Sequence, residues 1–314
     1  MLNLIASRIA LVVPQLALLS LVVFALTYFV PGSAAAAVLG TAANPESIAQ
    51  LETQLGLDRP FFERLGSWYA GVLQGDLGTS YVSARPVTQL FAERLPASLS
   101  LIGGGLVVSA VFGFALGLLG GTKPGSLRDR ISTALSSLSL SIPEFWIGIV
   151  LLLVFAVQLG WLPVVSYVPL TSDIVGWLRG MVLPSLSLGI VGCALIARQL
   201  RSSLAGAREA RYMDSLTAAG VPQSRLIGRY ALKNAMVPVL GASSITVSVM
   251  IGTSFAIEKV FAFPGIGTLM LRSVTGKDFA VVQGGVLLIA VLVIAVNLLI
   301  DIAYGLIDPK ARAA

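Results

Sequence analysis

The 314-residue sequence predicts an all-α integral membrane protein with six transmembrane helices, and two observations lead to that fold class. First, charged residues make up 11% of the chain, against about 25% in soluble domains, and the mean hydropathy is +0.90. Second, the chain holds six long stretches with almost no charge, each close to the length of about 20 residues that a helix needs to cross a bilayer.

The six stretches define the predicted spans in chain order. They are 9–30, 95–122, 131–157, 180–197, 234–257 and 279–300. The first is longer than the apolar region of a signal peptide, so we expect it to be retained as a helix. The third contains one acid, Glu144, and the fourth is the shortest.

Basic residues set the predicted orientation. Six spans place both termini on one side of the membrane, and cytoplasmic loops are enriched in Lys and Arg. With cytoplasmic termini, the inside segments carry most of the 21 Lys and Arg residues. We therefore expect a multi-pass protein whose partner is the lipid bilayer. The same asymmetry accounts for the sequence pI of about 9.7 without any nucleic-acid partner.

The spans divide the chain into three predicted parts. Residues 1–31 hold the N-terminal tail and the first helix, 32–94 form an extracytoplasmic segment, and 95–310 form a five-helix core. A second long connection, at about 198–236, lies on the cytoplasmic side of that core. Connections of this length are usually functional or contain helices of their own.

Missing residue types exclude several kinds of active site. The chain has no His, which removes His-based metal sites, His general bases and Ser-His-Asp catalysis. Cys193 is the single Cys and lies in an apolar stretch, so a buried hydrophobic role is favoured over a reactive thiol. Gly276-Lys277 lacks the upstream glycines of a phosphate-binding loop. We expect neither an enzyme, nor a metal site, nor a cofactor bound by this chain.

The connection at 198–236 is the most informative loop. A polar helix is expected at 207–219, where Gly220-Val221-Pro222 would stop it, and a short amphipathic helix at 224–235 would lead into the fifth span. Its apolar residues suit docking onto another protein. A basic helix held by anionic lipid headgroups is the other interpretation, and both remain open at this point.

Two stretches of this loop resemble a known family. Residues 212–220 (YMDSLTAAG) and 232–238 (LKNAMVP) resemble the EAA loop of binding-protein-dependent ABC importer permeases. In that family the loop forms a coupling helix that inserts into a cleft of the ATPase subunit. The family's glycine corresponds to Gly220 and its leading acid to Asp214, whereas Ser215 and Leu216 stand where the family has alanines.

The resemblance extends over nearly the whole chain. Motifs similar to those of the dipeptide/oligopeptide/nickel branch occur in order at 55–60 (LGLDRP), 75–80 (GDLGTS), 142–148 (IPEFWIG), 263–267 (FPGIG), 281–284 (VVQG) and 308–310 (DPK). The chain resembles the B-type permease of that branch. This implies a type I ABC importer permease fold with a cytoplasmic coupling helix, located in the bacterial cytoplasmic membrane.

The resemblance also implies partners and cargo. The expected partners are a similar C-type permease, two ATPase subunits that carry ATP and Mg, and an extracytoplasmic binding protein. The expected function is import of di- and oligopeptides by alternating access. Import of a nickel chelate, haem or another small solute is the alternative within the same architecture. An ion-driven secondary transporter would need paired intramembrane ionisable groups or inverted repeats, which the sequence does not show.

Site residues follow by position. Those expected to couple to the ATPase are Tyr212, Asp214, Ser215, Leu216, Ala218, Gly220, Val221, Pro222 and Arg225. Those expected at an external gate or in contact with the binding protein are Glu258, Phe261, Phe263, Pro264, Gly265 and Gly267. A membrane-interface aromatic turn is the other interpretation of this second group.

Two further features of the spans are candidates for specific roles. Glu144 follows Pro143 within the third span, so it either lines the substrate path or caps a helix broken at the proline. Gly113, Gly117 and Gly121 are spaced four residues apart on the second span. Small residues at that spacing allow helix backbones to approach closely, within the chain or across a permease dimer.

Overall fold

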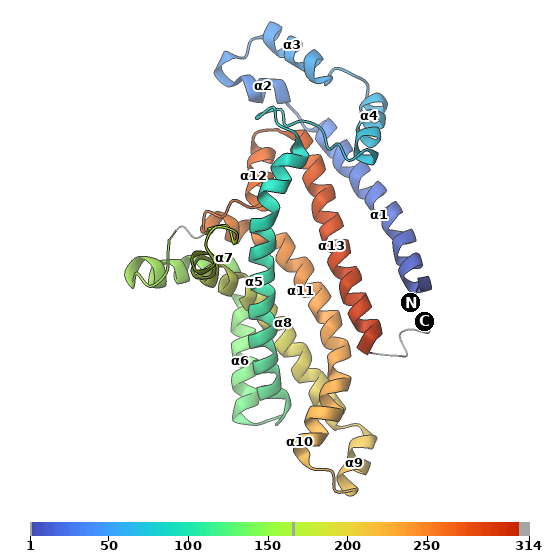
Figure 1. Ribbon diagram of the computed structural model, residues 1–314, viewed down its shortest axis with the longest axis vertical. Coiled ribbons are helices and arrows are strands. Elements are labelled where there is room, and N and C mark those ends of the chain that lie inside the picture. Colours follow the sequence, from blue (N-terminus) through green and yellow to red (C-terminus); the bar gives the residue numbers. More distant parts are fainter. Residues whose placement is uncertain (1, 165–166, 308–314) are drawn as a thin grey trace. The chain divides into compact units, whose positions relative to one another are not determined.

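The computed structural model describes residues 2–164 and 167–307, and these form helices joined by short connections (Figure 1). Among the described residues, β-type pairing is confined to one isolated antiparallel bridge between Thr79 and Pro86. This confirms the all-α prediction. The motif at 308–310 lies outside the described residues.

Five helical stretches are long and apolar enough to cross a membrane. They are Leu11–Phe29 within α1 (Leu2–Phe29), α5 (Val87–Gly121), α8 (Ile174–Arg208), Gln223–Val260, and Phe279–Gly305 within α13 (Phe279–Ile307). The sixth candidate is a bent pair, α6 (Leu127–Ser141) followed by Glu144–Gln158. The predicted number of spans is reached when this pair counts as one span.

The third predicted span is therefore not one continuous helix. Its two halves are bent by 97° at Ile142-Pro143. Pro143 has no N–H to donate and disfavours helical geometry at the preceding residue, so Ile142 is extended, with φ −108° and ψ 129°. The second half begins as α7 (Glu144–Leu151) and continues as a π-helical turn, Leu152–Gln158. Glu144 lies in the first turn of α7, where its negative charge meets the positive end of the helix dipole.

The loop predicted at 198–236 is shorter than expected and differently divided. α8 continues to Arg208, and α9 (Arg211–Ala218) replaces the helix expected at 207–219. The helix expected at 224–235 is not separate: α10 (Gln223–Arg225), a π-helical turn (Leu226–Ala231) and α11 (Leu232–Val260) follow one another directly. Pro238 lies inside α11 without ending it.

The segment between α1 and α5 carries three short α-helices. These are α2 (Ala34–Leu39), α3 (Pro45–Leu55) and α4 (Phe61–Leu73), and a further short helix, α12 (Ile266–Thr275), precedes α13. Asn44 and Ser47 cap the start of α3 reciprocally, and Gly56 ends it with φ +65°. α5 begins at Val87, so the boundary expected at residue 94 falls inside a helix.

Contacts group the described chain into two compact units rather than the three consecutive parts expected. The core unit holds residues 2–4, 99–263 and 295–307, apart from 165–166. The N-terminal unit holds Ile5–Ser98 and Pro264–Ile294. Each unit thus combines segments that are distant in sequence, which charge and hydropathy patterns do not reveal.

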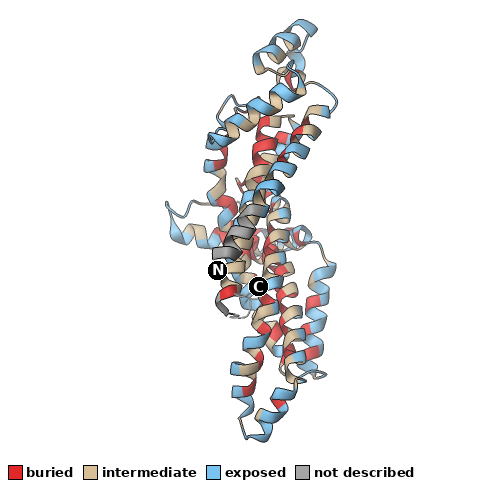
Figure 2. Ribbon diagram, turned by 90° about the vertical axis from the view of Figure 1, so that its right-hand side faces the viewer, coloured by how far each residue is buried: buried red, intermediate tan, exposed pale blue. Residues whose placement is uncertain are grey.

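α8 is the buried centre of the core unit. Within its most apolar stretch 72% of the residues are buried, against 28% for the stretch that includes α11. In Figure 2 buried residues recur along the helices while large parts of the ribbon are exposed. Many of the exposed side chains are large and apolar, as expected for helices that face lipid.

α5 meets α8 at three glycines, Gly113, Gly117 and Gly121, which face Ile196, Leu200 and Leu204 respectively. A Cβ atom added at any of them would lie 2.8–2.9 Å from the Cβ of its partner, closer than real Cβ atoms approach. At Gly113 it would also lie 3.0 Å from the carbonyl oxygen of Cys193. The structure therefore places these glycines in a helix–helix contact within the chain. The sequence interpretation missed Gly105 and Gly189 higher in the same contact, where a Cβ on Gly189 would lie 2.8 Å from the Gly105 carbonyl.

This contact predicts a position-dependent effect of glycine-to-alanine substitutions on α5. Gly113→Ala is expected to destabilise the protein by about 1–3 kcal/mol, because the added methyl overlaps the α8 backbone. Gly103→Ala on the same helix is the control, since its position is exposed and has no atom within 4 Å of an added Cβ. It should be neutral, or stabilising by up to about 1 kcal/mol through helix propensity. Thermal unfolding in detergent checks this, and equal melting temperatures for the two variants would contradict the α5–α8 contact.

Candidate functional site

α9 is held against the core unit by one apolar face. Met213 is 6% exposed and belongs to a buried cluster with residues from α8 and α11. We call this the loop cluster; its buried members are Ile196, Leu200, Leu204, Met213, Leu226, Ala231, Ala235 and Val239. Leu216 and Val221 pack against it. α9 is thus anchored directly on the helices that it connects.

Gly220 ends α9 in a hydrogen-bonded cap. Its φ is +77°, its N–H donates to the Thr217 carbonyl at 3.0 Å, and the Val221 N–H donates to the Leu216 carbonyl at 3.1 Å. This pattern is a Schellman motif, and the accompanying apolar contact is supplied by Leu216 and Val221. No atom lies within 4 Å of a Cβ added at Gly220, so the position requires glycine for its backbone conformation rather than for space.

The remaining predicted coupling residues lie on the exposed side of this loop. They are Tyr212, Asp214, Ser215, Ala218, Pro222 and Arg225, together with Gly220 itself. The Tyr212 hydroxyl accepts a hydrogen bond from the Asn234 side-chain amide at 2.9 Å. The loop therefore has two sides: an apolar side seated on the loop cluster, and a mixed polar side open to a partner.

Two polar links secure α8 beside this loop, and the sequence analysis did not single out either. Asp129 at the start of α6 is 5% exposed and accepts from the Gly125 N–H at 2.8 Å and from the Arg201 guanidinium, with 3.0 Å between Nη2 and Oδ2. The Arg208 guanidinium donates to the Thr122 carbonyl. These links join the C-terminal part of α8 to the α5–α6 connection. The sequence shows that these charged residues exist. It does not show which of them pair, because the partners are more than 70 residues apart.

Glu144 is buried in the core unit. It is 8% exposed, and its Oε1 atom has no hydrogen-bond partner among the described residues. Its carboxyl group is within hydrogen-bonding reach of the Thr253 hydroxyl on α11. One turn later, a Cβ on Gly148 would lie 3.2 Å from the Phe261 ring and 3.3 Å from the Ser187 hydroxyl. The start of α7 therefore packs closely against α8 and the end of α11.

The residues expected at an external gate do not form one exposed patch. Glu258, Phe261 and Phe263 are only 0–1% exposed in the core unit. The Phe263 N–H donates to the Glu258 carbonyl at 2.7 Å, and the Tyr167 ring packs edge-on against the Phe263 ring with centroids 5.1 Å apart. In this conformation these three side chains are covered by their own chain, and their expected role at a gate or in binding-protein contact stays a prediction.

The second half of that motif belongs to the N-terminal unit. Gly265 is buried at the start of α12, Gly267 and Pro264 are partly buried, and the Ile266 N–H donates to the Ser98 hydroxyl at 2.8 Å. The turn is thus pinned to the start of the α5 span rather than free at the surface. Sequence pattern alone favoured exposure because Pro and Gly are typical of surface turns.

The described residues contain no group of three or more His, Cys, Asp or Glu placed to hold a metal ion. Cys193 is 8% exposed on α8, with its backbone facing Gly113. Its burial agrees with a packing role.

Known families and proteins resemble this chain along its whole length. The family of binding-protein-dependent transport system inner membrane components matches residues 110–313, and the N-terminal part of such membrane components matches residues 1–102. A protein of Brucella abortus (strain 2308), named provisionally as a peptide transport system permease protein, is 34% identical over 309 residues, 98% of either chain. The glutathione transport system permease protein GsiC of Salmonella choleraesuis (strain SC-B67) is 35% identical over 312 residues, 99% of either chain.

A solved structure shares the fold. The MetNI methionine ABC transporter, in an inward-facing conformation, matches with a TM-score of 0.55 at 19% identity, and the match covers 70% of this chain and 97% of that one. This confirms the expected ABC importer permease fold. The chain therefore belongs to the family of binding-protein-dependent transport system inner membrane components, as a membrane-spanning permease of an ABC importer whose ATP hydrolysis takes place on separate subunits.

Proposed function

We propose that this chain imports di- and oligopeptides as one of two similar permease subunits, together with two ATPase subunits and an extracytoplasmic binding protein. Two full-length relatives are named for transport of a peptide and of glutathione, itself a tripeptide, and this supports the cargo. The observation that carries the mechanism is the two-sided loop at α9, anchored on one face and open on the other.

The anchoring of α9 gives the ATPase a mechanical path to the spans. Met213 and Leu226 pack with α8 and α11 side chains in the loop cluster, so a displacement of α9 acts on both spans at once. For ATP to drive import, the ATPase pair must bind two permease conformations with different affinity. ATP and Mg belong to the ATPase subunits in this proposal. The excess of basic residues on the α9 side supports a cytoplasmic position for α9 and for both termini in this proposal.

Glu144 is the proposed contact for the peptide within the membrane. A buried carboxylate with an oxygen that lacks a partner is costly inside a membrane protein and suits a transient cationic ligand. The N-terminal ammonium of a peptide provides that charge. The same carboxylate also stabilises the first turn of α7, so the two roles need separate measurements.

The cargo is tested by uptake into proteoliposomes that hold the whole complex and receive its binding protein. Labelled di- and tripeptides are expected to accumulate only when ATP is supplied on the ATPase side. A nickel chelate and haem serve as competing cargoes in the same preparation. Accumulation of either in place of peptide would replace the peptide assignment while keeping the importer architecture.

Gly220 is expected to be sensitive to the conformation rather than the size of its substituent. Gly220→Val should reduce peptide uptake per ATP hydrolysed several-fold, since a β-branched residue at φ +77° breaks the cap that fixes the exposed side of α9. Gly220→Asn should retain most coupling because Asn tolerates left-handed geometry. Gly228→Ala, at an exposed helical glycine with open space, is the control. Normal uptake and ATPase assembly in Gly220→Val would refute the coupling role of this loop.

Glu144→Gln separates the two roles of the buried carboxylate. If it binds the peptide ammonium, uptake of peptides with a free N-terminus should fall about tenfold, the size expected for one charged hydrogen bond. Uptake of N-acetylated peptides should change little, and the amount of assembled complex should stay the same. Glu46→Gln, at an exposed position in α3, is the matched control. An equal loss for both kinds of peptide would assign Glu144 to helix stability instead.

A further inference from the structure

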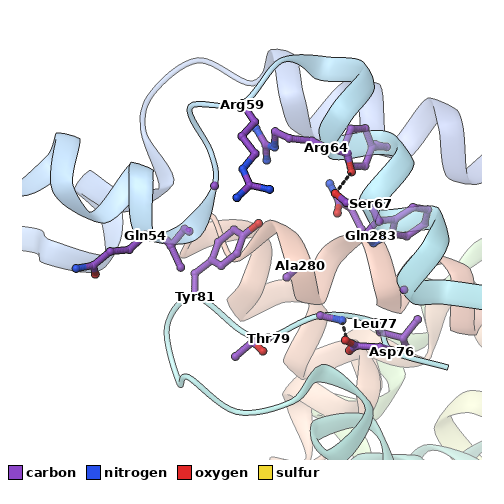
Figure 3. A pocket seen from close by; sticks show the side chains of 16 residues that line it. Gln54, Arg59, Arg64, Ser67, Asp76, Leu77, Thr79, Tyr81, Ala280 and Gln283 are labelled. Carbon is purple, nitrogen blue, oxygen red and sulfur yellow. Dashed lines mark hydrogen bonds between the residues drawn. The ribbon is translucent and has the colours of Figure 1, made fainter. Parts of the chain in front are cut away.

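The N-terminal unit contains a pocket of about 400 Å³, to whose lining the motifs at 55–60, 75–80 and 281–284 contribute (Figure 3). It lies between the end of α3, α4, the loop at 76–81 and the first turns of α13. Its lining residues are Phe24, Gln54, Leu55, Gly56, Arg59, Arg64, Ser67, Trp68, Gly71, Asp76, Leu77, Gly78, Thr79, Tyr81, Ala280 and Gln283. In the close-up, Arg59 and Arg64 extend into the pocket from one wall, and Asp76 lies on the opposite wall.

The walls of the pocket are held by backbone geometry and buried hydrogen bonds. A Cβ on Gly71 would lie 3.1 Å from the Asp76 carbonyl, so α4 and the loop approach closely there. Asp278 is 3% exposed and accepts from the Ser80 hydroxyl at 2.5 Å and from the Tyr81 N–H at 3.0 Å, which fixes the loop on α13. The walls of the pocket are therefore held in place by contacts within this unit.

The charged residues that line the pocket are two arginines, which are hydrogen-bond donors, and one aspartate. Arg64 is already oriented: its Nη1 donates to the Leu57 carbonyl at 3.3 Å, and its guanidinium carbon lies 5.3 Å from the centroid of the Tyr28 ring. Arg59 makes no hydrogen bond or ion pair with the described residues, and its Nε atom lies near Gly56, 3.5 Å from where an added Cβ would stand. The Trp68 indole N–H is buried and has no partner in the described part of the chain.

A phenol adds a further donor. Burial raises the pKa of Tyr81 above its ordinary value, and the neighbouring Arg64 lowers it in part, so the hydroxyl keeps its proton at neutral pH. Against these donors, Asp76 is the one acid in the lining, and its Oδ1 already accepts from the Gly78 N–H at 2.8 Å. The lining has net positive charge and suits an anionic group.

The pocket lies at the level where two spans end. Phe24 belongs to the last part of the α1 span, while Ala280 and Gln283 belong to the first turns of the α13 span. The Gln283 amide donates to the Thr27 hydroxyl at 2.6 Å and joins the two spans there. The ends of spans lie in the interfacial zone of a bilayer, where lipid headgroups are found.

Aromatic side chains mark the same level. Two lining residues, Phe24 and Trp68, belong to a connected group of rings that consists of Phe24, Tyr28, Phe29, Phe61, Phe62, Trp68 and Tyr69. Trp and Tyr are enriched at membrane interfaces. On α4, Phe62 is 81% exposed and Leu73 is 87% exposed, and Phe29 at the end of α1 is 75% exposed. These uncovered apolar side chains next to a cationic pocket match a ligand that joins an anionic group to acyl chains.

From this combination we propose that the pocket binds the headgroup of an anionic phospholipid, with its phosphodiester at Arg59, Arg64 and the Trp68 indole N–H. Arginine binds phosphate through paired charge-assisted hydrogen bonds, and the free guanidinium of Arg59 supplies the group that gains most from a ligand. The lipid then fixes α4 between α1 and α13. This assignment is independent of the cargo and of the coupling loop.

Lipid retention in nanodiscs tests the site directly. The full transporter complex is reconstituted in phosphatidylcholine alone or mixed with phosphatidylglycerol, and bound lipid is counted by native mass spectrometry after mild delipidation. Wild type should retain phosphatidylglycerol in preference to phosphatidylcholine. Arg59→Gln should weaken that retention about tenfold, and Trp68→Phe, which keeps the ring and removes the N–H, should weaken it several-fold. Arg272→Gln, an exposed basic residue outside the pocket, is the control and should match wild type.

Three outcomes would overturn the lipid assignment. One is equal retention of phosphatidylglycerol by wild type and Arg59→Gln. Another is Arg59-dependent thermal stabilisation by alanyl-alanine in phosphatidylcholine nanodiscs, which would identify a peptide carboxylate as the ligand. The third is the same stabilisation by inorganic phosphate with no preference for phosphatidylglycerol, which would identify a site for free anions.

Discussion

The close approach of α5 and α8 is the constraint on which the core unit depends. Two helix backbones can come this near only where one of them has no side chains, and α5 provides such a row at Gly113, Gly117 and Gly121. The row spans more than two turns and matches the four-residue spacing of the facing α8 side chains. α8 is thereby fixed in the centre, and the other helices of the unit pack around it. Inside a bilayer this matters more than in water, because apolar side chains gain little by leaving lipid and close packing must hold the helices.

The same contact reaches the loop at α9 through shared residues. Leu200 and Leu204 face α5 glycines and are also members of the loop cluster that seats α9. On either side of Leu204, Arg201 and Arg208 bind the C-terminal part of α8 to the α5–α6 connection through Asp129 and the Thr122 carbonyl. A buried carboxylate such as Asp129 is tolerated only with its partners in place, so this link strongly favours one arrangement of the two helices. α9 is therefore seated on helices that are tied to one another by both apolar packing and buried polar links.

Sequence predicted what depends on composition and short-range spacing. The lack of charge defined the spans, the glycine spacing on α5 indicated a helix contact, and Gly220 marked the end of α9. The sharp bend at Pro143 was only partly foreseen, because a proline can either kink a membrane helix or end it and the choice depends on neighbouring helices. The burial of Glu258 and Phe263 and the pairing of Asp129 with Arg201 were not foreseen. They depend on contacts between distant segments, for which one sequence carries no signal.

The π-helical turn at Leu226–Ala231 explains how the loop cluster includes residues from both the loop and the membrane span. The buried residues that the π-helical turn and α11 contribute are Leu226, Ala231, Ala235 and Val239, separated by steps of five, four and four. A regular α-helix would rotate Leu226 off the face shared by the other three, since residues on one face recur every three or four positions. The π-helical turn at Leu226–Ala231 accommodates one additional residue per turn and returns Leu226 to that face. The chain after Gly220 can therefore bury Leu226 in the same cluster as Met213. It then continues into α11 without a break. The wider turn at Leu226–Ala231 thus keeps the loop cluster continuous from α9 into the membrane span.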